Sequence, residues 1–125
     1  MQDHKTAVEK TIIMSQITTH ILDTSLGKPA QGVTIVLYQG GNDEWSEFGR
    51  GKTNADGRLP DLLNTNDPVQ PGIYKLRFET KDYFDQQHIA TFYPYVEIIF
   101  DIQNTEHYHV PLLLNPFGYS TYRGS

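Results

Sequence analysis

The sequence predicts a mainly β fold, an antiparallel β-sandwich of about eight strands with one short helix. Runs of β-branched and aromatic residues recur between turn signals, which is the spacing typical of sandwiches and barrels. Residues 73–79 alternate apolar and polar side chains so regularly that one face of this strand must be buried and the other wet. A chain of 125 residues with 38% hydrophobic and 20% charged residues has the length and composition of one globular domain.

Turn residues divide the chain into short strands. We expect strands, in chain order, over residues 16–22, 33–38, 45–53, 73–79, 95–102, 107–114 and 119–123. Residues 25–29 are predicted to form a loop, and Gly40-Gly41-Asn42-Asp43 predicts a hairpin connection. Asn54-Ala55-Asp56-Gly57 predicts a turn after the third strand.

The segment 80–89 has a helical rather than a strand pattern. Tyr83 and Phe84 stand at helical spacing from the polar residues that follow, so we predict a short helix on the outside of the sheets. Thr80 is the expected N-cap, and Asp82 lies in the first turn, where a negative charge is favourable.

Pro111 is unusual for its position, because it falls inside a strand that should be central in its sheet. Proline has no N–H to donate and is disfavoured there. We therefore predict a bulge or a locally unpaired position at Pro111.

Charge and composition exclude several classes of function. The net charge of -5 and the pI near 5.4 give no electrostatic footprint for nucleic acid or an anionic membrane. Cysteine is absent, which excludes disulfides, thiolate nucleophiles and cysteine metal sites. No run approaches the roughly 20 apolar residues of a membrane span. Residues 1–13 lack the apolar core of a secretory signal, so we expect a cytoplasmic protein. We expect these residues to form a loosely held extension, and the alternative is a helical arm that docks on a partner.

Three histidines and one arginine carry the predicted chemistry. His107 and His109 are two residues apart, so in a strand they project from the same face. His20 lies in the first strand, and Arg58 follows a turn glycine that can aim its side chain across a cleft. Imidazoles can act as general acid and base near neutral pH, and arginine can stabilise a developing oxyanion. This set suits water attack on an acyl carbon without metal or cofactor.

Other interpretations of the same residues stay open at this point. Each histidine could be a hydrogen-bonded structural residue, and Arg58 could be a solvated turn residue. His107 and His109 could bind zinc with His20 as a third ligand, although no nearby carboxylate completes an obvious ligand set. Residues 122–125 could be disordered, as chain termini usually are.

Three motifs together give the chain a family resemblance. The ending Tyr122-Arg123-Gly124-Ser125, with Thr18-Thr19-His20-Ile21-Leu22-Asp23 and Asp56-Gly57-Arg58, resembles 5-hydroxyisourate hydrolase, the transthyretin-like enzyme of urate breakdown. The resemblance runs from about Ser15 to Ser125. Its specific part is the Tyr-Arg-Gly-Ser ending, which the hormone-carrying relatives of the same fold lack. It implies a transthyretin-like sandwich and a hydrolase domain over residues 14–125.

The resemblance also implies an activity and an assembly. Such enzymes open the six-membered ring of 5-hydroxyisourate by hydrolysing its N1–C6 amide bond, without metal or cofactor. The product is 2-oxo-4-hydroxy-4-carboxy-5-ureidoimidazoline. The family is a homotetramer, a dimer of dimers, with its active sites in the channel between the dimers.

Residue roles follow from the matching positions. The catalytic residues implied are His20, Arg58, His109 and Ser125. Substrate binding is implied for His20, Arg58, Tyr122, Arg123 and Ser125. As hypotheses, His109, alone or with His20, activates water, and Arg58 binds the carbonyl edge and stabilises negative charge. Ser125 orients substrate or water through its hydroxyl or a terminal carboxylate, while Tyr122 and Arg123 shape the pocket.

A small-ligand carrier of the transthyretin type is the alternative function. Such a carrier would use the same central channel and would present small or apolar residues to a large apolar ligand. Here the corresponding places hold His109 and Tyr122, which narrow the channel and make it polar. The sequence therefore favours the hydrolase.

Overall fold

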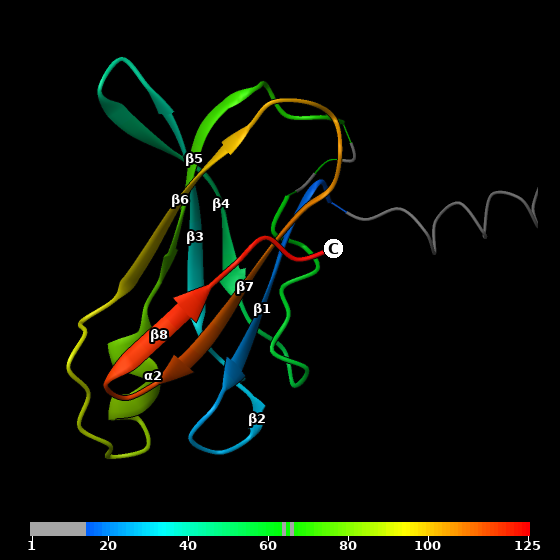
Figure 1. Ribbon diagram of the computed structural model, residues 1–125. Helices are drawn as coiled ribbons and strands as arrows, with labels where there is room; N and C mark the ends of the chain where they lie inside the picture. The colour runs from blue at the N-terminus through cyan, green and yellow to red at the C-terminus, as the bar shows by residue number, and fades with distance from the viewer. Residues whose placement is uncertain (1–14, 64, 66) are drawn as a thin grey trace, which may run out of the picture.

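Alternating apolar and polar residues fold this chain into two sheets whose inner faces form the core (Figure 1). The computed structural model describes residues 15–63, 65 and 67–125. One four-stranded sheet, in the order β2-β1-β7-β8, consists of β1 (Ile17–Asp23), β2 (Lys28–Pro29), β7 (Tyr108–Asn115) and β8 (Gly118–Thr121). The other, in the order β4-β3-β5-β6, consists of β3 (Thr34–Gly41), β4 (Glu44–Lys52), β5 (Gly72–Phe78) and β6 (Val96–Ile102). The predicted extension over residues 1–13 lies outside the described residues.

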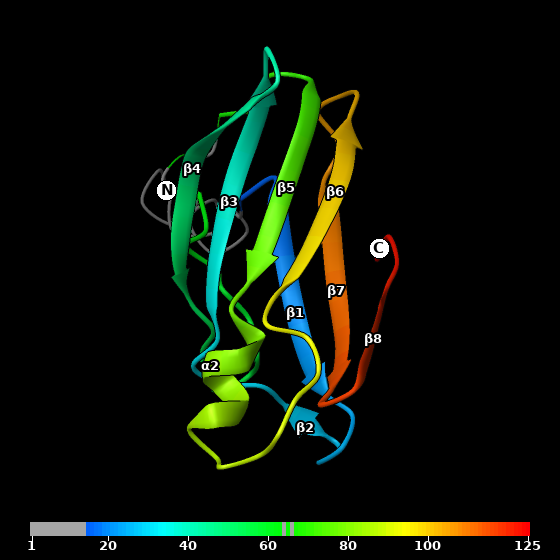
Figure 2. The same cartoon turned by 90° about the vertical axis from the view of Figure 1, so that its left-hand side faces the viewer.

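The two sheets lie face to face, with the strands of one in front of those of the other (Figure 2). Strand β1 shows the pattern that produces the core, because its residues alternate strictly between buried and half-buried. Ile17 and Ile21 are fully buried against side chains of the other sheet such as Leu37 and Leu76. The outward face of β1 therefore carries polar side chains, and the site described below lies on that face.

The antiparallel prediction holds for every pair of neighbouring strands in the described sheets except one. Strands β1 and β7 pair in parallel, from Ile17 beside Tyr108 to Asp23 beside Leu114. This register places Thr18 beside His109 although the two residues are 91 positions apart in the sequence.

The hairpin predicted at residues 40–43 is confirmed. Gly41 pairs with Glu44, and the two loop residues Asn42 and Asp43 have positive φ angles of 51° and 66°. Left-handed conformations at both positions are those of the two-residue turn that matches the twist of a hairpin. The loop predicted at residues 25–29 is partly wrong, because Lys28 and Pro29 pair with the end of β1 as the short strand β2.

The helix is shorter than predicted and begins differently. Helix α2 (Thr80–Asp85) has Glu79 at its N-cap position, without a side-chain capping hydrogen bond. Thr80 is the first helical residue instead, and its buried hydroxyl has no hydrogen-bond partner among the described residues. His88 has a φ angle of 59°, and the N–H of Ile89 donates to the carbonyl of Phe84, so the chain leaves the helix in a left-handed turn. In the described part of the chain, no helix is long and apolar enough to cross a membrane.

The unpaired position predicted at Pro111 is confirmed. The ladder between β7 and β8 runs from Asn115 beside Gly118 to Leu112 beside Thr121, and it resumes only as a single bridge between His109 and Gly124. Pro111 lies in the gap, where its carbonyl accepts a hydrogen bond of 2.7 Å from the Thr121 hydroxyl. Residues 122–123 therefore leave the ladder before the chain returns to β7.

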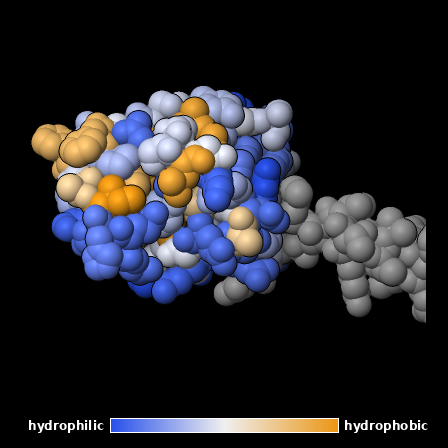
Figure 3. Space-filling model, turned by 90° about the horizontal axis from the view of Figure 1, so that it is seen from below, coloured by the Kyte–Doolittle hydropathy of each residue, from blue (hydrophilic) through white to orange (hydrophobic). Residues whose placement is uncertain are grey.

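The surface at the end of the sandwich near α2 and β2 has a mixed hydropathy. Seen from this end, hydrophobic side chains form small groups between larger hydrophilic areas, and no continuous apolar band crosses the surface (Figure 3).

Candidate active site

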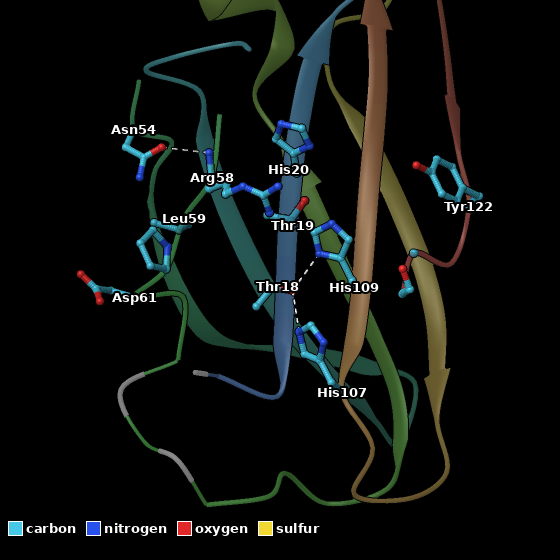
Figure 4. A pocket seen from close by; sticks show the side chains of 13 residues that line it. Thr18, Thr19, His20, Asn54, Arg58, Leu59, Asp61, His107, His109 and Tyr122 are labelled. Carbon is cyan, nitrogen blue, oxygen red and sulfur yellow. Dashed lines mark hydrogen bonds between the residues drawn. The ribbon is translucent and has the colours of Figure 1, made fainter. Parts of the chain in front are cut away.

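A cleft of about 690 Å³ lies on the outer face of the β2-β1-β7-β8 sheet. Three parts of the chain surround it: the strands β1 and β7, the loop after β4, and the segment 122–125 (Figure 4). Its polar lining consists of Thr18, Thr19, His20, Asn54, Arg58, Asp61, His107, His109, Tyr122 and Ser125. Five of the six site residues predicted from the sequence line this cleft, and Arg123 does not.

The parallel pairing of β1 and β7 brings hydroxyl and imidazole groups together. Thr18 and His20 share the outward face of β1, as the two-residue period of a strand requires. The Thr18 hydroxyl lies 2.7 Å from Nε2 of His107 and 2.8 Å from Nδ1 of His109. The two imidazole rings are stacked, with centroids 6.2 Å apart and planes at 26° (Figure 4).

A glycine turn places Arg58 opposite His20. Gly57 has a φ of 72°, and a Cβ there would lie 2.5 Å from the Ile21 carbonyl oxygen, so only glycine fits. The N–H of Ile21 donates to the Gly57 carbonyl at 2.9 Å, which holds the turn against β1. The side-chain oxygen of Asn54 accepts hydrogen bonds from the N–H groups of Asp56 and Arg58 and closes the turn. The backbone of Arg58 then pairs with the backbone of His20 in an isolated antiparallel β-bridge.

A second glycine holds the segment 122–125 against His109. The N–H of Gly124 donates to the His109 carbonyl at 2.8 Å. A Cβ at Gly124 would lie 2.5 Å from Cδ2 of the His109 ring and 3.2 Å from Cγ of Pro111. The backbone at position 124 therefore packs directly on the imidazole, and Tyr122 and Ser125 reach the cleft on either side of it.

Arg123 points away from the cleft. Its guanidinium lies 4.2 Å from the centre of the Tyr108 ring and 3.3 Å from both the Glu106 carboxylate and the His107 carbonyl. Side chains alternate in an extended segment, so Arg123 takes the side opposite to Tyr122 and Gly124. The contacts of Arg123 therefore hold residues 122–125 against the start of β7.

Burial and positive charge lower the pKa of two site histidines. The pKa of His20 is lowered by burial and then by the Arg58 guanidinium, against an opposing effect of Asp56. The pKa of His109 is lowered by burial, Arg58, His107 and His20, against the opposing effect of a hydrogen bond that the ring donates to the Thr18 backbone. Both shifts favour the neutral imidazole, which has one ring nitrogen with a lone pair.

Metal binding finds no support in the geometry. Within residues 15–63, 65 and 67–125, no three histidine or carboxylate side chains group in a way that could hold a metal ion. His107 and His109 instead direct ring nitrogens to the same hydroxyl group.

Several residues of the cleft had no assigned role in the sequence analysis. Thr18 stands two residues before His20, so strand alternation alone could have placed both on one face. His107 was expected on the same strand face as His109 and as a possible zinc ligand, but without a role in the hydrolysis. Asn54 and Asp61 reach the cleft through the loop after β4, and for Asp61 the sequence carries no signal.

The fold and the cleft define a transthyretin-like sandwich with a polar site. The family model for the HIUase/Transthyretin family matches residues 17–124. The 5-hydroxyisourate hydrolase of Mus musculus is 47% identical over 114 residues, which cover 89% of this chain and 96% of the mouse protein. The chain therefore belongs to the HIUase/Transthyretin family.

Solved structures of both branches resemble the chain. The structure of Klebsiella pneumoniae 5-hydroxyisourate hydrolase has a TM-score of 0.79 and 38% identity, over 90% of this chain and 100% of that one. Sea bream transthyretin in complex with thyroxine has a TM-score of 0.82 and 32% identity, over 87% of this chain and 94% of that one. The fold alone therefore does not separate a hydrolase from a carrier.

We expect the lowered pKa values of His20 and His109 to affect two measurements, the NMR titration of the imidazoles and the pH dependence of the free energy of unfolding. NMR titration of the imidazoles should place both below the ordinary value of about 6.5. Below about pH 6.5 the two imidazoles bind protons in the unfolded chain more readily than in the folded chain. The free energy of unfolding therefore falls as the pH drops below about 6.5. It becomes level once both folded-state imidazoles are protonated. Replacing both histidines with glutamine should remove this part of the slope, and an unchanged slope would contradict the assignment.

Proposed function

We propose that this chain hydrolyses 5-hydroxyisourate to 2-oxo-4-hydroxy-4-carboxy-5-ureidoimidazoline in urate degradation. The observation that carries the proposal is the convergence of His20, Arg58 and His109 on one cleft. Two neutral imidazoles beside a permanent cation are the groups that amide hydrolysis needs. Relatives named 5-hydroxyisourate hydrolase support the choice of substrate.

The proposed reaction begins with water activation. His109 takes a proton from water as the oxygen attacks C6 of the ring amide, and negative charge develops on the carbonyl oxygen. Arg58 binds that oxygen, and its charge stabilises the tetrahedral intermediate. The N1–C6 bond then breaks, the imidazolium returns its proton to N1, and C6 becomes the carboxylic acid of the product, which loses its remaining proton to solvent. His20 lies beside Arg58 and is proposed to share the proton transfer.

The segment 122–125 is proposed to complete the substrate pocket. Ser125 orients substrate or water, and Tyr122 forms one wall. The sequence implied direct substrate binding by Arg123 as well. Its contacts with Tyr108, Glu106 and the His107 carbonyl support a different role, in which Arg123 anchors the segment.

Carriage of a small aromatic ligand is the second candidate function. The likeness to sea bream transthyretin in complex with thyroxine favours it. The polar lining of the cleft, with His20, Arg58 and His109, is poorly suited to a large apolar ligand. Binding of thyroxine at micromolar concentration without hydrolysis of 5-hydroxyisourate would favour the carrier.

The proposal extends to assembly and location. We propose a homotetramer, a dimer of dimers, built from the hydrolase domain over residues 14–125. Strands β6 and β8 are the outer strands of their sheets in the described chain, so both have an edge available for pairing with another copy. Tyr122 is 58% exposed at the open side of the cleft. The cytoplasmic location stays a prediction from the sequence.

The first test of the function is turnover of freshly made 5-hydroxyisourate, followed by its absorbance in an assay coupled to urate oxidase. Arg58→Ala and His109→Ala should each lower kcat about a hundredfold or more, because each removes a group that acts on the transition state. Arg50→Ala is the matched control, since Arg50 is exposed on β4 and pairs with Glu47 outside the cleft. Wild-type rates in both site variants would contradict the role assignment.

A pair of glycine variants tests whether the segment 122–125 must pack on His109. Gly124→Ala should lower turnover about tenfold or more, because the new Cβ would displace either the imidazole or the segment. Gly118→Ala is the matched control, because its Cβ would meet only the Asn115 side chain, at 3.7 Å. Thermal unfolding should change little in either variant. Full activity of Gly124→Ala would show that the contact is not needed.

Assembly can be checked by light scattering at assay concentrations. We expect the mass of four chains for the active protein. A monomer with full activity would contradict the proposal that the sites lie in a channel between dimers.

A further inference from the structure

One hydroxyl group connects two imidazoles at the edge of the cleft. Thr18 Oγ1 lies within hydrogen-bond distance of Nε2 of His107 and of Nδ1 of His109, at 2.7 and 2.8 Å. A threonine hydroxyl has a single hydrogen to donate and lone pairs with which to accept. If both imidazoles are neutral and Thr18 donates to one of them, the other must either donate to Thr18 or lack a hydrogen bond. The tautomers of His107 and His109 are therefore coupled through Thr18.

The ring of His109 is fixed in one orientation. Nδ1 faces Thr18, while the Cδ2 edge lies against the backbone of Gly124. A flip of the ring would exchange these two edges and lose the hydrogen bond to Thr18. Nε2 is consequently the only nitrogen of His109 left to accept a proton from water.

Only one coupled arrangement leaves His109 able to act as a base. Nε2 must carry a lone pair, so Nδ1 of neutral His109 must carry the hydrogen and donate it to Thr18. Thr18 must then direct its own hydrogen to Nε2 of His107.

We propose that Thr18 and His107 are positioning residues that hold His109 as its Nδ1–H tautomer, with Nε2 free to take a proton. This proposal rests on the proposed hydrolase function for its kinetic consequence, but not for the tautomer itself. When Nε2 takes the proton of water, Nδ1–H still donates to Thr18, and Thr18 still donates to His107. The proton transfer therefore needs no rearrangement of the three residues.

In the same arrangement, protonation of His107 would prevent His109 from acting as the base. When His107 is protonated, both of its ring nitrogens are donors, so Thr18 must accept from it. The Thr18 hydrogen then turns to Nδ1 of His109, which places the hydrogen of neutral His109 on Nε2 and leaves His109 without a lone pair for the proton of water. Other charged groups also face this part of the cleft: Arg58 and His20 lower the pKa of His109, Asp56 opposes the lowered pKa of His20, and Asp61 lines the same cleft.

Four variants test the positioning role by kinetics. Thr18→Val keeps the shape of the side chain but removes the hydroxyl, and it should lower kcat about tenfold or more with KM changed less than twofold. Thr18→Ser keeps the hydroxyl and should restore most of kcat. His107→Leu removes the acceptor and should behave like Thr18→Val. His107→Gln supplies an amide oxygen as an acceptor for the Thr18 hydroxyl, so it should keep most of kcat.

Nitrogen-15 NMR of histidine-labelled protein tests the tautomer without any substrate. In the wild type near pH 7.5, His109 should show a protonated Nδ1 and an unprotonated Nε2, and Thr18→Val should shift this ratio toward Nε2–H. An Nε2–H tautomer of His109 in the wild type would overturn the inference, as would a Thr18→Val variant with wild-type kcat and an unchanged tautomer. If the wild type does not hydrolyse 5-hydroxyisourate, the proposed function fails, while the NMR measurement still decides the inference about the tautomer.

Discussion

Strands β1 and β7 lie side by side in parallel, and this pairing positions the threonine and histidine side chains of the cleft. It places Thr18 beside His109 and His20 beside Pro111, so polar side chains from two distant segments meet on one outward face. The inward faces of the same strands bury Ile17, Ile21 and Leu112 in the core. A slip of one residue would exchange the two faces of a strand, so the core that stabilises the sandwich also fixes the register of the site.

Two close backbone contacts bring the remaining groups to this surface. Gly57 lets a turn lie on the Ile21 carbonyl, and the next residue is Arg58. Gly124 lets the segment 122–125 lie on the ring of His109. Pro111 contributes to the second contact, because a strand residue without an N–H interrupts the β7–β8 ladder at the point where this segment leaves it.

The chemistry of the cleft depends on a balance between burial and charge. Partial burial and the Arg58 guanidinium both disfavour the protonated imidazoles of His20 and His109, which keeps them available as bases at neutral pH. The same guanidinium is available for negative charge on a substrate oxygen. A transthyretin-like sandwich with an apolar channel would have neither property, so a few side chains on one face distinguish a hydrolase from a carrier of the same fold.

The sequence by itself determined the features that depend on neighbouring residues. Strand alternation correctly predicted that one face of the strand over residues 73–79 is buried. The hairpin followed from Gly40-Gly41-Asn42-Asp43, and the interruption of the β7–β8 ladder followed from Pro111. Only the tertiary structure decided that β1 lies parallel to β7, that Thr18 connects His107 and His109, and that Arg123 turns toward Tyr108. Periodicity and turn chemistry act over a few residues, whereas these contacts join positions that only the packing of two sheets brings together.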